Sequence, residues 1–587
     1  MSPLPHINGL EPEDYVDRRK LLRDTRGNLT KLLGTFKERE KVLVIISFLA
    51  FAPFFLPAMC FFCFPLAVII TIFYLVSCAR AALPLRLPAR AERRDPHSPT
   101  PGHLSFNKAS GIFFLGNEAG SGKELWLEKK DILTHMLLMG TTGSGKTEAL
   151  VSLAYNALAT GSGFFYIDPK AEAQLNMEIW QMTRLLGRDD DFRVLNYGTT
   201  LPTDPTKRLS NTNNPFSLGG ADALTQVLGS LMPPSSGGAN SIFADKAMGL
   251  ISGLMYALCD LRDKGYLPLS VKKIRDYLSA DRCIGLLHDT RLSDMSRAAL
   301  KAALLNCNFV EGKEKQPQAF YEQYGYAQSY FGRALSSLTD TYGHIYGVES
   351  GEVDFQDLVL NRRILLTLLP SMEKSPQELL SLGKITLSAI RTAAAVGLGL
   401  NIEGKESEVL GSLPVHFQGT GPFLNIVDEY AAIVTPGFEI LLTQGRSLGM
   451  ATIVASQDYA GIVEADPKGA QQIIANTNVK VFMRLAESER TWQLLNGLTG
   501  EEAVIETSGY RMESGNLLSE GTWQDSLGAQ AQKRTLVSLK DLLEQNEGEA
   551  HCILGGLFAR ARLFYANPQL KGAVMRVPRL LEMETLD

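Results

Sequence analysis

The octapeptide at residues 140–147, Gly-Thr-Thr-Gly-Ser-Gly-Lys-Thr, constrains the fold of this chain more than any other segment. It has the pattern of a phosphate-binding loop, which joins a buried strand to a helix. The apolar run Met136–Met139 precedes it, and the helix-forming run Glu148–Val151 follows it. The backbone N–H groups of such a loop surround phosphates at a helix N-terminus. The sequence therefore predicts a parallel α/β sheet with a nucleotide at one edge.

The residues of this loop have different expected roles. Its glycines let successive N–H groups curl around a pyrophosphate. Lys146 can reach the β- and γ-phosphates, and the Thr147 hydroxyl can ligate Mg²⁺. A glycine turn that binds nothing is the alternative, and the partner motifs described next weigh against it. The predicted nucleotide-binding residues are Gly140, Thr141, Thr142, Gly143, Ser144, Gly145, Lys146 and Thr147.

A second motif, Phe423–Glu429, has the form of a buried strand that ends in two acids. We expect Asp428 to hold the Mg²⁺ ion and Glu429 to polarise the attacking water as the catalytic base. An acid pair alone is equally typical of a solvated strand end. In combination with the phosphate loop, it predicts an enzyme that hydrolyses ATP, with ATP and Mg²⁺ as cofactors.

Two further polar residues follow the acid pair. Gln457 stands at the end of the next apolar strand, Ala451–Ala455, where an amide can contact the γ-phosphate. Arg446 comes eleven residues earlier, and an arginine there can act on the site of a neighbouring subunit. A surface arginine and an edge glutamine fit the spacing equally well. We predict catalytic roles for Lys146, Glu429, Arg446 and Gln457.

The segment Val42–Ala79 contains no charged residue. One membrane span needs about 20 residues, so this run fits two short spans with a turn near Pro53–Pro57. Basic residues flank it on both sides, which favours cytoplasmic ends and an even number of crossings. A buried helical hairpin of a soluble protein is the alternative. We expect a bacterial inner-membrane hairpin with most of the chain in the cytoplasm.

Other segments outline the rest of the fold. Apolar strands are expected at 111–115, 124–127, 163–168, 363–369, 423–427, 451–455 and 479–483. Between about 220 and 346 only helical patterns appear, which indicates an all-α insertion. There Phe320, Tyr324, Ala327 and Phe331 recur at helical spacing. A core stripe is the favoured interpretation of this pattern, and a base-stacking platform is the alternative.

These motifs occur together with several others in a fixed order. The set comprises residues 42–79, the phosphate loop, Asp168–Glu172 (DPKAE), Asn214–Phe216 (NPF), the helical insertion, IVDEY, GRSLGMATIVASQD and Asn476–Asn478 (NTN). In this combination the chain resembles the type IV secretion coupling proteins of the TraG/TraD class, and among them those of type IVB systems. The resemblance covers nearly the whole chain.

The resemblance implies a RecA-like P-loop ATPase domain with an all-α insertion and a membrane hairpin. It implies a hexamer with ATP between subunits, which hands substrates to a type IV secretion channel. In this family Lys146, Thr147, Asp428 and Glu429 match the nucleotide machinery, Gln457 the sensor and Arg446 a trans-acting finger. The expected parts are an arm (1–41), the hairpin (42–79), a linker (80–105), the nucleotide-binding domain (106–219 and 347–568), the insertion (220–346) and a tail (569–587).

Two departures from the family pattern limit what the resemblance implies, the first for the loop at Ala171 and the second for the partners. Ala171 stands where many relatives have glycine. The chain also stops at Asp587, without the long tail on which such proteins dock chaperone adaptors, so adaptor-dependent delivery is in doubt. The net charge of −5 gives no overall basic field, so any contact with DNA must be local or arise on assembly.

Three functions are compatible with these motifs. The first is a coupling ATPase that moves DNA–relaxase complexes or effector proteins into the channel. The second is a DNA translocase of the FtsK/HerA kind, and the third is a membrane receptor or scaffold that does not hydrolyse ATP. The acid pair favours a motor over a scaffold. The cargo, the surface that recognises it, the oligomer order and whether Arg446 acts in trans are left open by the sequence.

Overall fold

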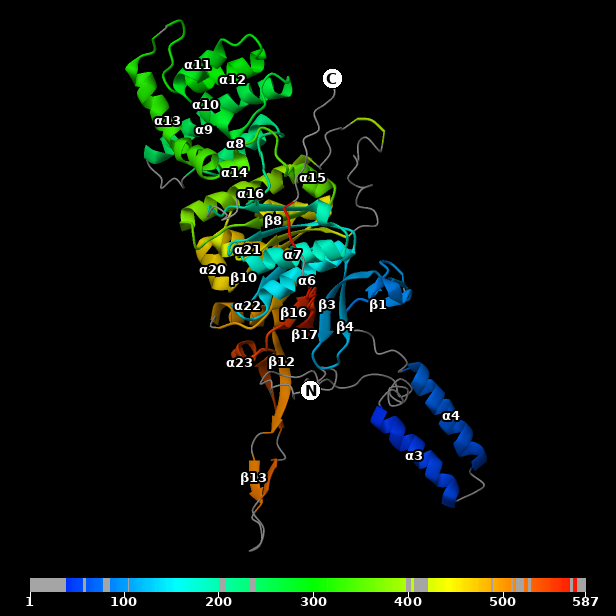
Figure 1. The fold of residues 1–587 in the computed structure, drawn as a ribbon. Coiled ribbons are helices and arrows are strands. Elements are labelled where there is room, and N and C mark those ends of the chain that lie inside the picture. Colours follow the sequence, from blue (N-terminus) through cyan, green and yellow to red (C-terminus); the bar gives the residue numbers. More distant parts are fainter. Residues whose placement is uncertain are drawn as a thin grey trace. The chain divides into compact units, whose positions relative to one another are not determined.

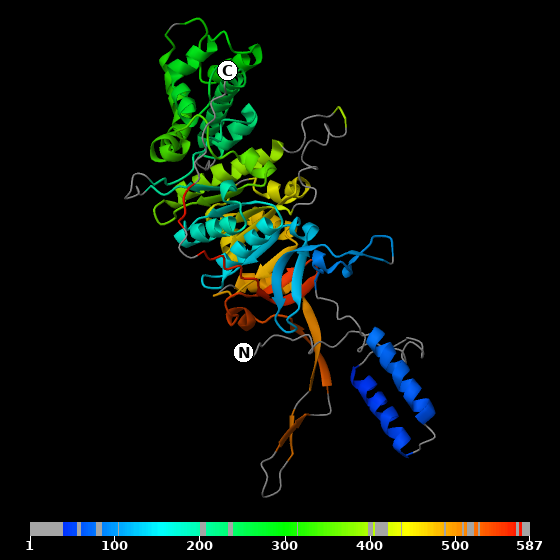
Figure 2. The same ribbon diagram turned by 45° about the vertical axis from the view of Figure 1, so that its right-hand side comes forward.

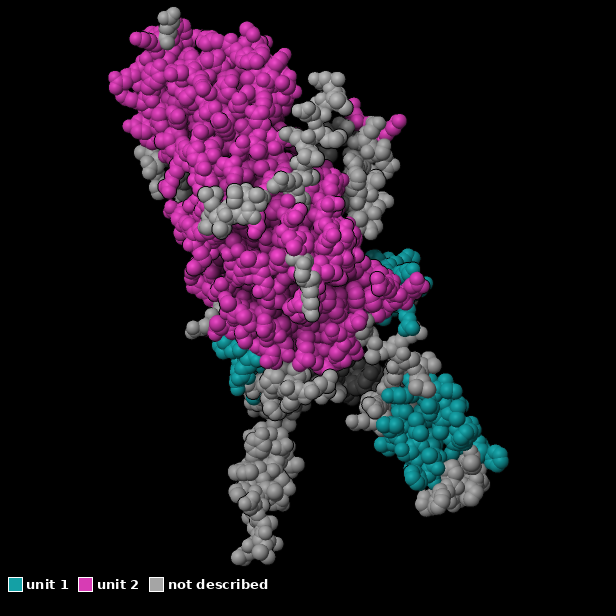
Figure 3. Space-filling view, viewed as in Figure 1, with its two compact units in different colours: residues 1–86, 93–108, 492–544 teal, residues 87–92, 109–491, 545–587 magenta. Residues whose placement is uncertain are grey.

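The computed structural model describes residues 39–55, 60–77, 85–103, 105–199, 207–232, 239–313, 315–396, 403–405, 421–435, 437–486, 489–507, 510–513, 522–525, 529–570 and 574–577. Most of the expected arm (1–41), the start of the linker (80–84), the turn at 56–59 and most of the tail lie outside these residues. The chain divides into two compact units (Figure 3). The first comprises residues 1–86, 93–108 and 492–544, and the second 87–92, 109–491 and 545–587.

The second unit is built on a sheet of eleven described strands, in the order β4-β3-β17-β16-β11-β5-β10-β9-β6-β8-β7 (Figure 1). Neighbours from β11 to β7 run parallel, and the pairs from β11 to β4 run antiparallel. The predicted parallel sheet is therefore present, with an antiparallel extension. The strands are β3 (Gly111–Glu118), β4 (Glu124–Glu128), β5 (Met136–Met139), β6 (Phe164–Asp168), β7 (Phe192–Asn196), β8 (Ile364–Leu368), β9 (Phe423–Val427), β10 (Met450–Ser456), β11 (Val479–Phe482), β16 (Glu549–Leu554) and β17 (Leu557–Leu563).

The parallel strands are apolar along their whole length because helices cover the sheet. Every residue of β5, β6, β9 and β10 is buried. Strands buried on both faces read as continuous hydrophobic runs, not as an alternation. Figures 1 and 2 show helices lying along the strands. The helices of the second unit outside the insertion are α5 (Lys129–Ile132), α6 (Lys146–Ala159), α7 (Ala173–Leu185), α15 (Phe355–Leu360), α16 (Pro376–Val396), α19 (Glu439–Gln444), α20 (Tyr459–Ala465) and α21 (Pro467–Asn476).

A helical insertion separates the paired strands β7 and β8, so it leaves and re-enters the sheet at one edge. The predicted core stripe on α13 is confirmed, because Phe320, Tyr324, Ala327 and Phe331 are at most 1% exposed. A π-helical turn at Ser337–Thr341 ends α13. The helices are α8 (Ala221–Gly229), α9 (Ala239–Asp263), α10 (Val271–Tyr277), α11 (Ala280–Leu287), α12 (Asp294–Leu305), α13 (Gln318–Ser336) and α14 (Gly343–Tyr346).

The first unit contains the two apolar helices α3 (Arg39–Phe55) and α4 (Cys60–Ser77), which pack against each other. Their side chains Leu43, Val44, Phe48, Phe51, Phe61, Phe62, Phe64, Ile69 and Ile72 are exposed. Within the described ranges, no helix has both the length and the hydropathy needed to cross a membrane. The unit also holds most of α22 (Glu489–Thr499), α23 (Leu539–Leu543) and the strand pairs β1 (Arg94–Pro99) with β2 (Phe106–Lys108), β12 (Glu501–Thr507) with β15 (Ala529–Thr535), and β13 (Tyr510–Glu513) with β14 (Thr522–Asp525). The domain boundaries and the membrane hairpin stay predictions.

Candidate functional site

The carboxyl ends of five neighbouring parallel strands meet at one edge of the sheet. Register pairs Met139 at the end of β5 with Ser456 on β10 and Phe482 on β11. Val427 at the end of β9 pairs with Val454 and Ile167. Ligands of open α/β sheets bind beyond such carboxyl ends. The segments that follow β5, β6, β9, β10 and β11 therefore form the candidate site.

The phosphate loop is fixed by backbone hydrogen bonds to the strands on both sides. The Gly140 N–H donates to Ser456 O at 3.1 Å, and the Thr141 N–H donates to Arg484 O at 3.0 Å. Gly143 and Gly145 have φ values of +73° and +88°, which favour glycine. Helix α6 begins directly afterwards at Lys146. The loop thus has the backbone form that the motif predicts.

Four of the predicted catalytic and metal-binding side chains meet beside this loop. The Lys146 Nζ lies 3.0 Å from Asp428 Oδ1 and 2.5 Å from Glu429 Oε1. The Gln457 Nε2 donates to the same Glu429 oxygen at 3.3 Å. Lys146 and Asp428 are buried, so these charges interact in a medium that screens them weakly. Sequence motifs 283 residues apart are therefore in direct contact.

Glu429 has an unusual backbone conformation for a residue with a side chain. Its φ of +44° lies in the left-handed region, which costs an L-residue about 1–2 kcal/mol. Such strain is concentrated at functional positions, where the surrounding structure enforces it. Its side chain contacts Lys146 and Gln457, and its backbone N–H donates to Asp428 Oδ1 at 2.8 Å. The strain therefore accompanies a side chain that is tightly placed.

The remaining residues of the loop are distributed around its tip. Ser144 is buried, Thr141 and Thr147 are half-buried, and Thr142 and Gly143 are exposed. Thr147 stands in the first turn of α6, directly after Lys146. Among the residues described, no group of three His, Cys, Asp or Glu side chains is arranged to hold a metal. A hydroxyl and one carboxylate still fit Mg²⁺, which in phosphate sites completes its shell with phosphate and water oxygens.

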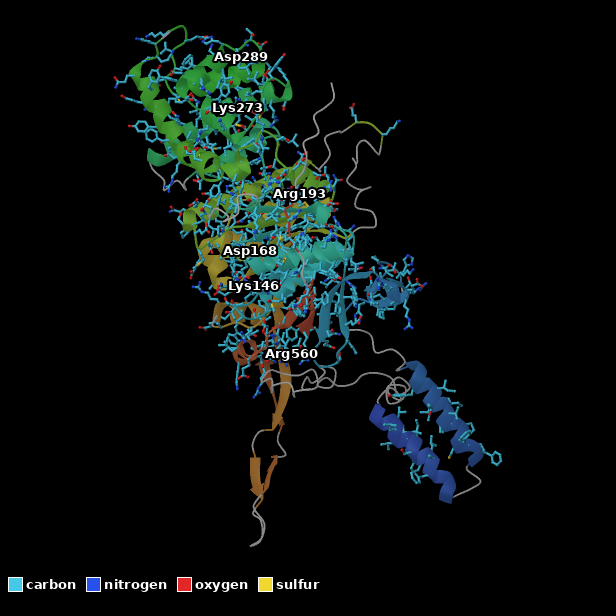
Figure 4. All side chains as sticks on the ribbon, in the orientation of Figure 1. Lys146, Asp168, Arg193, Lys273, Asp289 and Arg560 are labelled. Atoms are coloured by element: carbon cyan, nitrogen blue, oxygen red, sulfur yellow. The ribbon has the colours of Figure 1, made fainter. Side chains whose placement is uncertain are left out.

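The sequence interpretation assigned no role to a second lysine that joins this cluster. The Lys170 Nζ lies 3.6 Å from Glu429 Oε1. Burial alone would lower the pKa of Lys170, but the carboxylates of Asp428 and Glu429 raise it above its usual value. Asp168 shapes the turn by accepting from the Lys170 and Glu172 N–H groups at 2.9 and 3.0 Å. Figure 4 labels Lys146 and Asp168, which lie in the same region of the second unit.

Two features of this turn follow from its burial and shape. Burial raises the pKa of Asp168 to about 6, although its two hydrogen bonds oppose that shift. Ala171 has a φ of +54°, in the left-handed region. That conformation is one that glycine adopts more readily than alanine. The sequence indicates Lys170 only through a charged turn directly after a buried strand. It does not show that β6 pairs with β9, the strand that ends at the acid pair.

Arg446 is not part of this cluster. It is exposed on the short 3₁₀ turn Gly445–Leu448, before the amino end of β10. It lies near His135, which directly precedes β5. The seven residues of β10 separate the two edges by roughly 20 Å at about 3.3 Å per residue. Within one subunit, Arg446 and the phosphate loop are therefore at opposite edges of the sheet.

Sequence comparisons agree with the motifs. Residues 422–547 match the family described as the TraM recognition site of TraD and TraG. Residues 100–179 match the FtsK/SpoIIIE family. The type 4 coupling protein DotL of Legionella pneumophila is 36% identical over 584 residues, which cover 96% of this chain and 74% of DotL.

Comparison with solved structures concerns the fold. The bacterial conjugative coupling protein TrwBdeltaN70, in an unbound form, has a TM-score of 0.51 at 16% identity, over 83% of this chain and 95% of that chain. TrwB in complex with the non-hydrolysable ATP analogue ADPNP has a TM-score of 0.50 at 16% identity, with the same coverage. The predicted RecA-like P-loop ATPase fold is confirmed by this likeness.

Proposed function

This chain belongs to the family of type IV coupling proteins, and we propose that the sheet-edge cluster around Lys146 is the ATPase site with which it drives transfer. It is a coupling ATPase of a secretion or conjugation system. The observation that carries the assignment of the site is the contact of Lys146 with Asp428, Glu429 and, through Glu429, Gln457. A phosphate loop, an acid pair and a polar sensor at one strand edge are the parts that ATP hydrolysis needs.

Each residue of the cluster has a proposed role. The N–H groups of the loop and Lys146 bind the phosphates of ATP. Thr147 and Asp428 would hold Mg²⁺, which would neutralise negative charge on the phosphates. Glu429 orients and deprotonates the attacking water, and Lys170 and Gln457 fix its carboxylate from two sides. This arrangement performs phosphoryl transfer to water.

Two substitutions test the site in the purified full-length protein. Lys146→Ala should abolish ATP binding, because it removes the cation of the loop. Glu429→Gln should keep ATP binding and lower turnover by about 10²–10⁴-fold, because general base catalysis contributes that much. Lys468→Ala and Glu464→Gln, at exposed positions on α21 and α20, serve as matched controls. Wild-type turnover in Glu429→Gln would reject the assignment.

The same assay separates the coupling ATPase from the two other candidates. Steady-state turnover excludes a scaffold that only binds ATP. Turnover stimulated by single-stranded DNA favours a DNA–relaxase cargo, and stimulation by effector proteins favours protein secretion. The match to the FtsK/SpoIIIE family at residues 100–179 covers the motor core that both kinds of ATPase share, so it does not favour a chromosome translocase.

We further propose that α3 and α4 anchor the chain in the bacterial inner membrane, with the bulk of the protein in the cytoplasm. The support is the charge-free run at 42–79, its basic flanks and the exposed apolar side chains of both helices. Lysine in place of Phe48 and Ile69 should release the protein on alkaline extraction of membranes, because a charge in a span costs about 2.5–3.5 kcal/mol. Leu185→Lys, on the exposed face of α7, is the control. Equal retention of both variants would contradict the anchor.

For assembly we propose a homo-hexamer that delivers a DNA–relaxase complex or effector proteins to the type IV secretion channel. The support is the position of Arg446, which is exposed and far from its own phosphate loop. A head-to-tail ring places such a residue at the site of the next subunit. Native mass spectrometry of the detergent-solubilised protein tests the subunit number, and a monomer at all concentrations would refute it.

A further inference from the structure

Arg484, which no motif singled out, is attached to the phosphate loop at two points. It follows β11, the strand that pairs with β5 on the side away from β10. Its carbonyl oxygen accepts from the Thr141 N–H at 3.0 Å. Its Nη2 donates to Gly143 O at 2.6 Å. One residue therefore spans the loop from its base to its tip.

The two flanks of the loop differ in chemistry. On the β10–β9 flank stand Gln457 and the carboxylate of Glu429, the groups that handle the terminal phosphate. On the β11–β16 flank stand Arg484 and the turn before β16, whose Gly548 N–H donates to Ser144 O at 2.9 Å. A nucleotide that presents its terminal phosphate to Glu429 must extend its nucleoside in the other direction. The β11–β16 flank is thus the nucleoside side.

The guanidinium of Arg484 is available for a ligand on that side. The side chain is half-buried, and its bond to Gly143 uses one of five N–H donors. Lys146 and Lys170 lie against carboxylates, whereas Arg484 contacts a neutral carbonyl oxygen. A planar guanidinium also packs against aromatic faces. Fixed beside the loop tip, it offers a flat cationic surface to a base.

We propose that Arg484 is the residue that holds the nucleoside, by packing its guanidinium against the base while it braces the loop through Gly143. Because every base has a π-face, this contact adds affinity with little selection between adenine and guanine. The substrate class is therefore a nucleoside triphosphate, held by stacking on its base and not by base-specific hydrogen bonds. The inference rests on the proposed nucleotide site and adds the half of the ligand that the phosphate loop does not bind.

Titration calorimetry on the full-length protein with Mg²⁺ and three probes, ATP, GTP and inorganic tripolyphosphate, tests this role. Arg484→Gln should weaken ATP and GTP alike, by about tenfold, and tripolyphosphate by less than about threefold. Arg484→Lys keeps the charge but loses the planar guanidinium. Its affinity for ATP and GTP should therefore lie between those of wild type and Arg484→Gln. Arg490→Gln, at an exposed position on α22, should change nothing. Melting temperatures check that each variant is folded.

The outcomes separate this inference from the site on which it rests. If Arg484→Gln weakens tripolyphosphate as much as ATP, Arg484 only shapes the loop and the nucleoside contact is refuted. If Arg484→Gln binds all three probes like wild type, Arg484 neither contacts the nucleoside nor braces the loop for binding. If Arg484→Gln loses affinity for only one of ATP and GTP, the stacking contact is refuted in favour of base-specific hydrogen bonds. Lys146→Ala is measured alongside: if it binds all three probes like wild type, the nucleotide site itself is wrong.

Discussion

His135 shows how a single buried side chain can join neighbouring elements at the amino edge of the sheet. Its Nδ1 accepts from the Thr452 N–H at 3.0 Å, so this nitrogen must be unprotonated. Burial lowers the pKa of His135 to about 4, the nearby charge of Arg446 acts in the same direction, and a hydrogen bond to the Leu442 backbone opposes them. The imidazole is therefore neutral at physiological pH. It links the strand of the phosphate loop to the segment that carries Arg446.

This neutrality predicts a pH dependence of stability. The folded pKa of about 4 lies below the unfolded value of 6.5, so the unfolded chain binds more protons between these pH values. The stabilisation is present above pH 6.5 and is lost as the pH falls to 4, by about 3 kcal/mol at most. His135→Asn, which tolerates the left-handed φ of +64°, lacks this loss. Denaturant unfolding at pH 7 and pH 5 should show a smaller drop in the free energy of unfolding for His135→Asn than for wild type. Equal drops in both proteins would contradict the role of His135.

Ala171 offers a second prediction at the residue scale. Its left-handed φ of +54° costs an L-residue about 1–2 kcal/mol, and glycine removes that cost. The greater freedom of glycine in the unfolded chain offsets part of the gain. Ala171→Gly should therefore raise the free energy of unfolding by about 0.5–1 kcal/mol, in spite of the flexibility that glycine adds.

Ala302→Gly is the matched control, because Ala302 is exposed in the middle of α12. The same change there should lower stability by about 1 kcal/mol. Thermal melting of both variants beside wild type gives the comparison. Opposite signs are expected, and a loss in both variants would mean that Ala171 is not strained.

At the scale of elements, α13 illustrates how a core stripe supports the helical insertion. Phe331 is 1% exposed, and Phe320 and Tyr324 bury the same face of the helix. Phe331→Ala should lower the free energy of unfolding by about 3–5 kcal/mol, because it leaves a cavity in a packed core. Glu322→Ala, on the exposed face, should change it by less than about 0.5 kcal/mol. Denaturant titration tests both, and a loss of DNA binding without a loss of stability would favour the rejected base-stacking interpretation.

The elements also show which parts of the fold could be predicted. Strands β6, β8, β9, β10 and β11 were predicted to within a residue at each end, because parallel strands under two layers of helix are continuous apolar runs. Strand β7 and the strands β16 and β17 were not identified. Short or charged segments such as Phe192–Asn196 and Leu557–Leu563 become strands by pairing with neighbours that lie far away in sequence.

The residues of the candidate site also differ in whether the sequence alone could identify them. Lys146, Asp428, Glu429 and Gln457 were found because the chemistry of each motif is local in sequence. Arg484 was not found, because its contact with Gly143 spans 341 residues and depends on β11 lying beside β5. A sequence pattern gives the residues that a strand presents at its end. It does not give the order of strands in the sheet, which decides what those residues meet.

At the scale of the whole molecule, the two edges of the sheet impose a requirement on assembly. The phosphate loop and Glu429 lie at the carboxyl edge, and the exposed Arg446 lies at the amino edge, roughly 20 Å away along β10. Packed strands cannot shorten that distance within one subunit. If Arg446 contributes to catalysis, it therefore acts on the nucleotide of a neighbour. Catalysis then depends on the ring, and neither subunit is complete by itself.

Co-expression of two inactive variants tests this dependence. Arg446→Ala lacks the finger, and Glu429→Gln lacks the base, so each alone should form an inactive oligomer. In a random mixture, about a quarter of the interfaces join an intact Glu429 to an intact Arg446 from the next subunit, because a heterologous interface takes each part from a different chain. ATP turnover should reappear at about that fraction of wild type. If Arg446 served its own subunit, the mixture would stay as inactive as its parents, and the trans arrangement would be refuted.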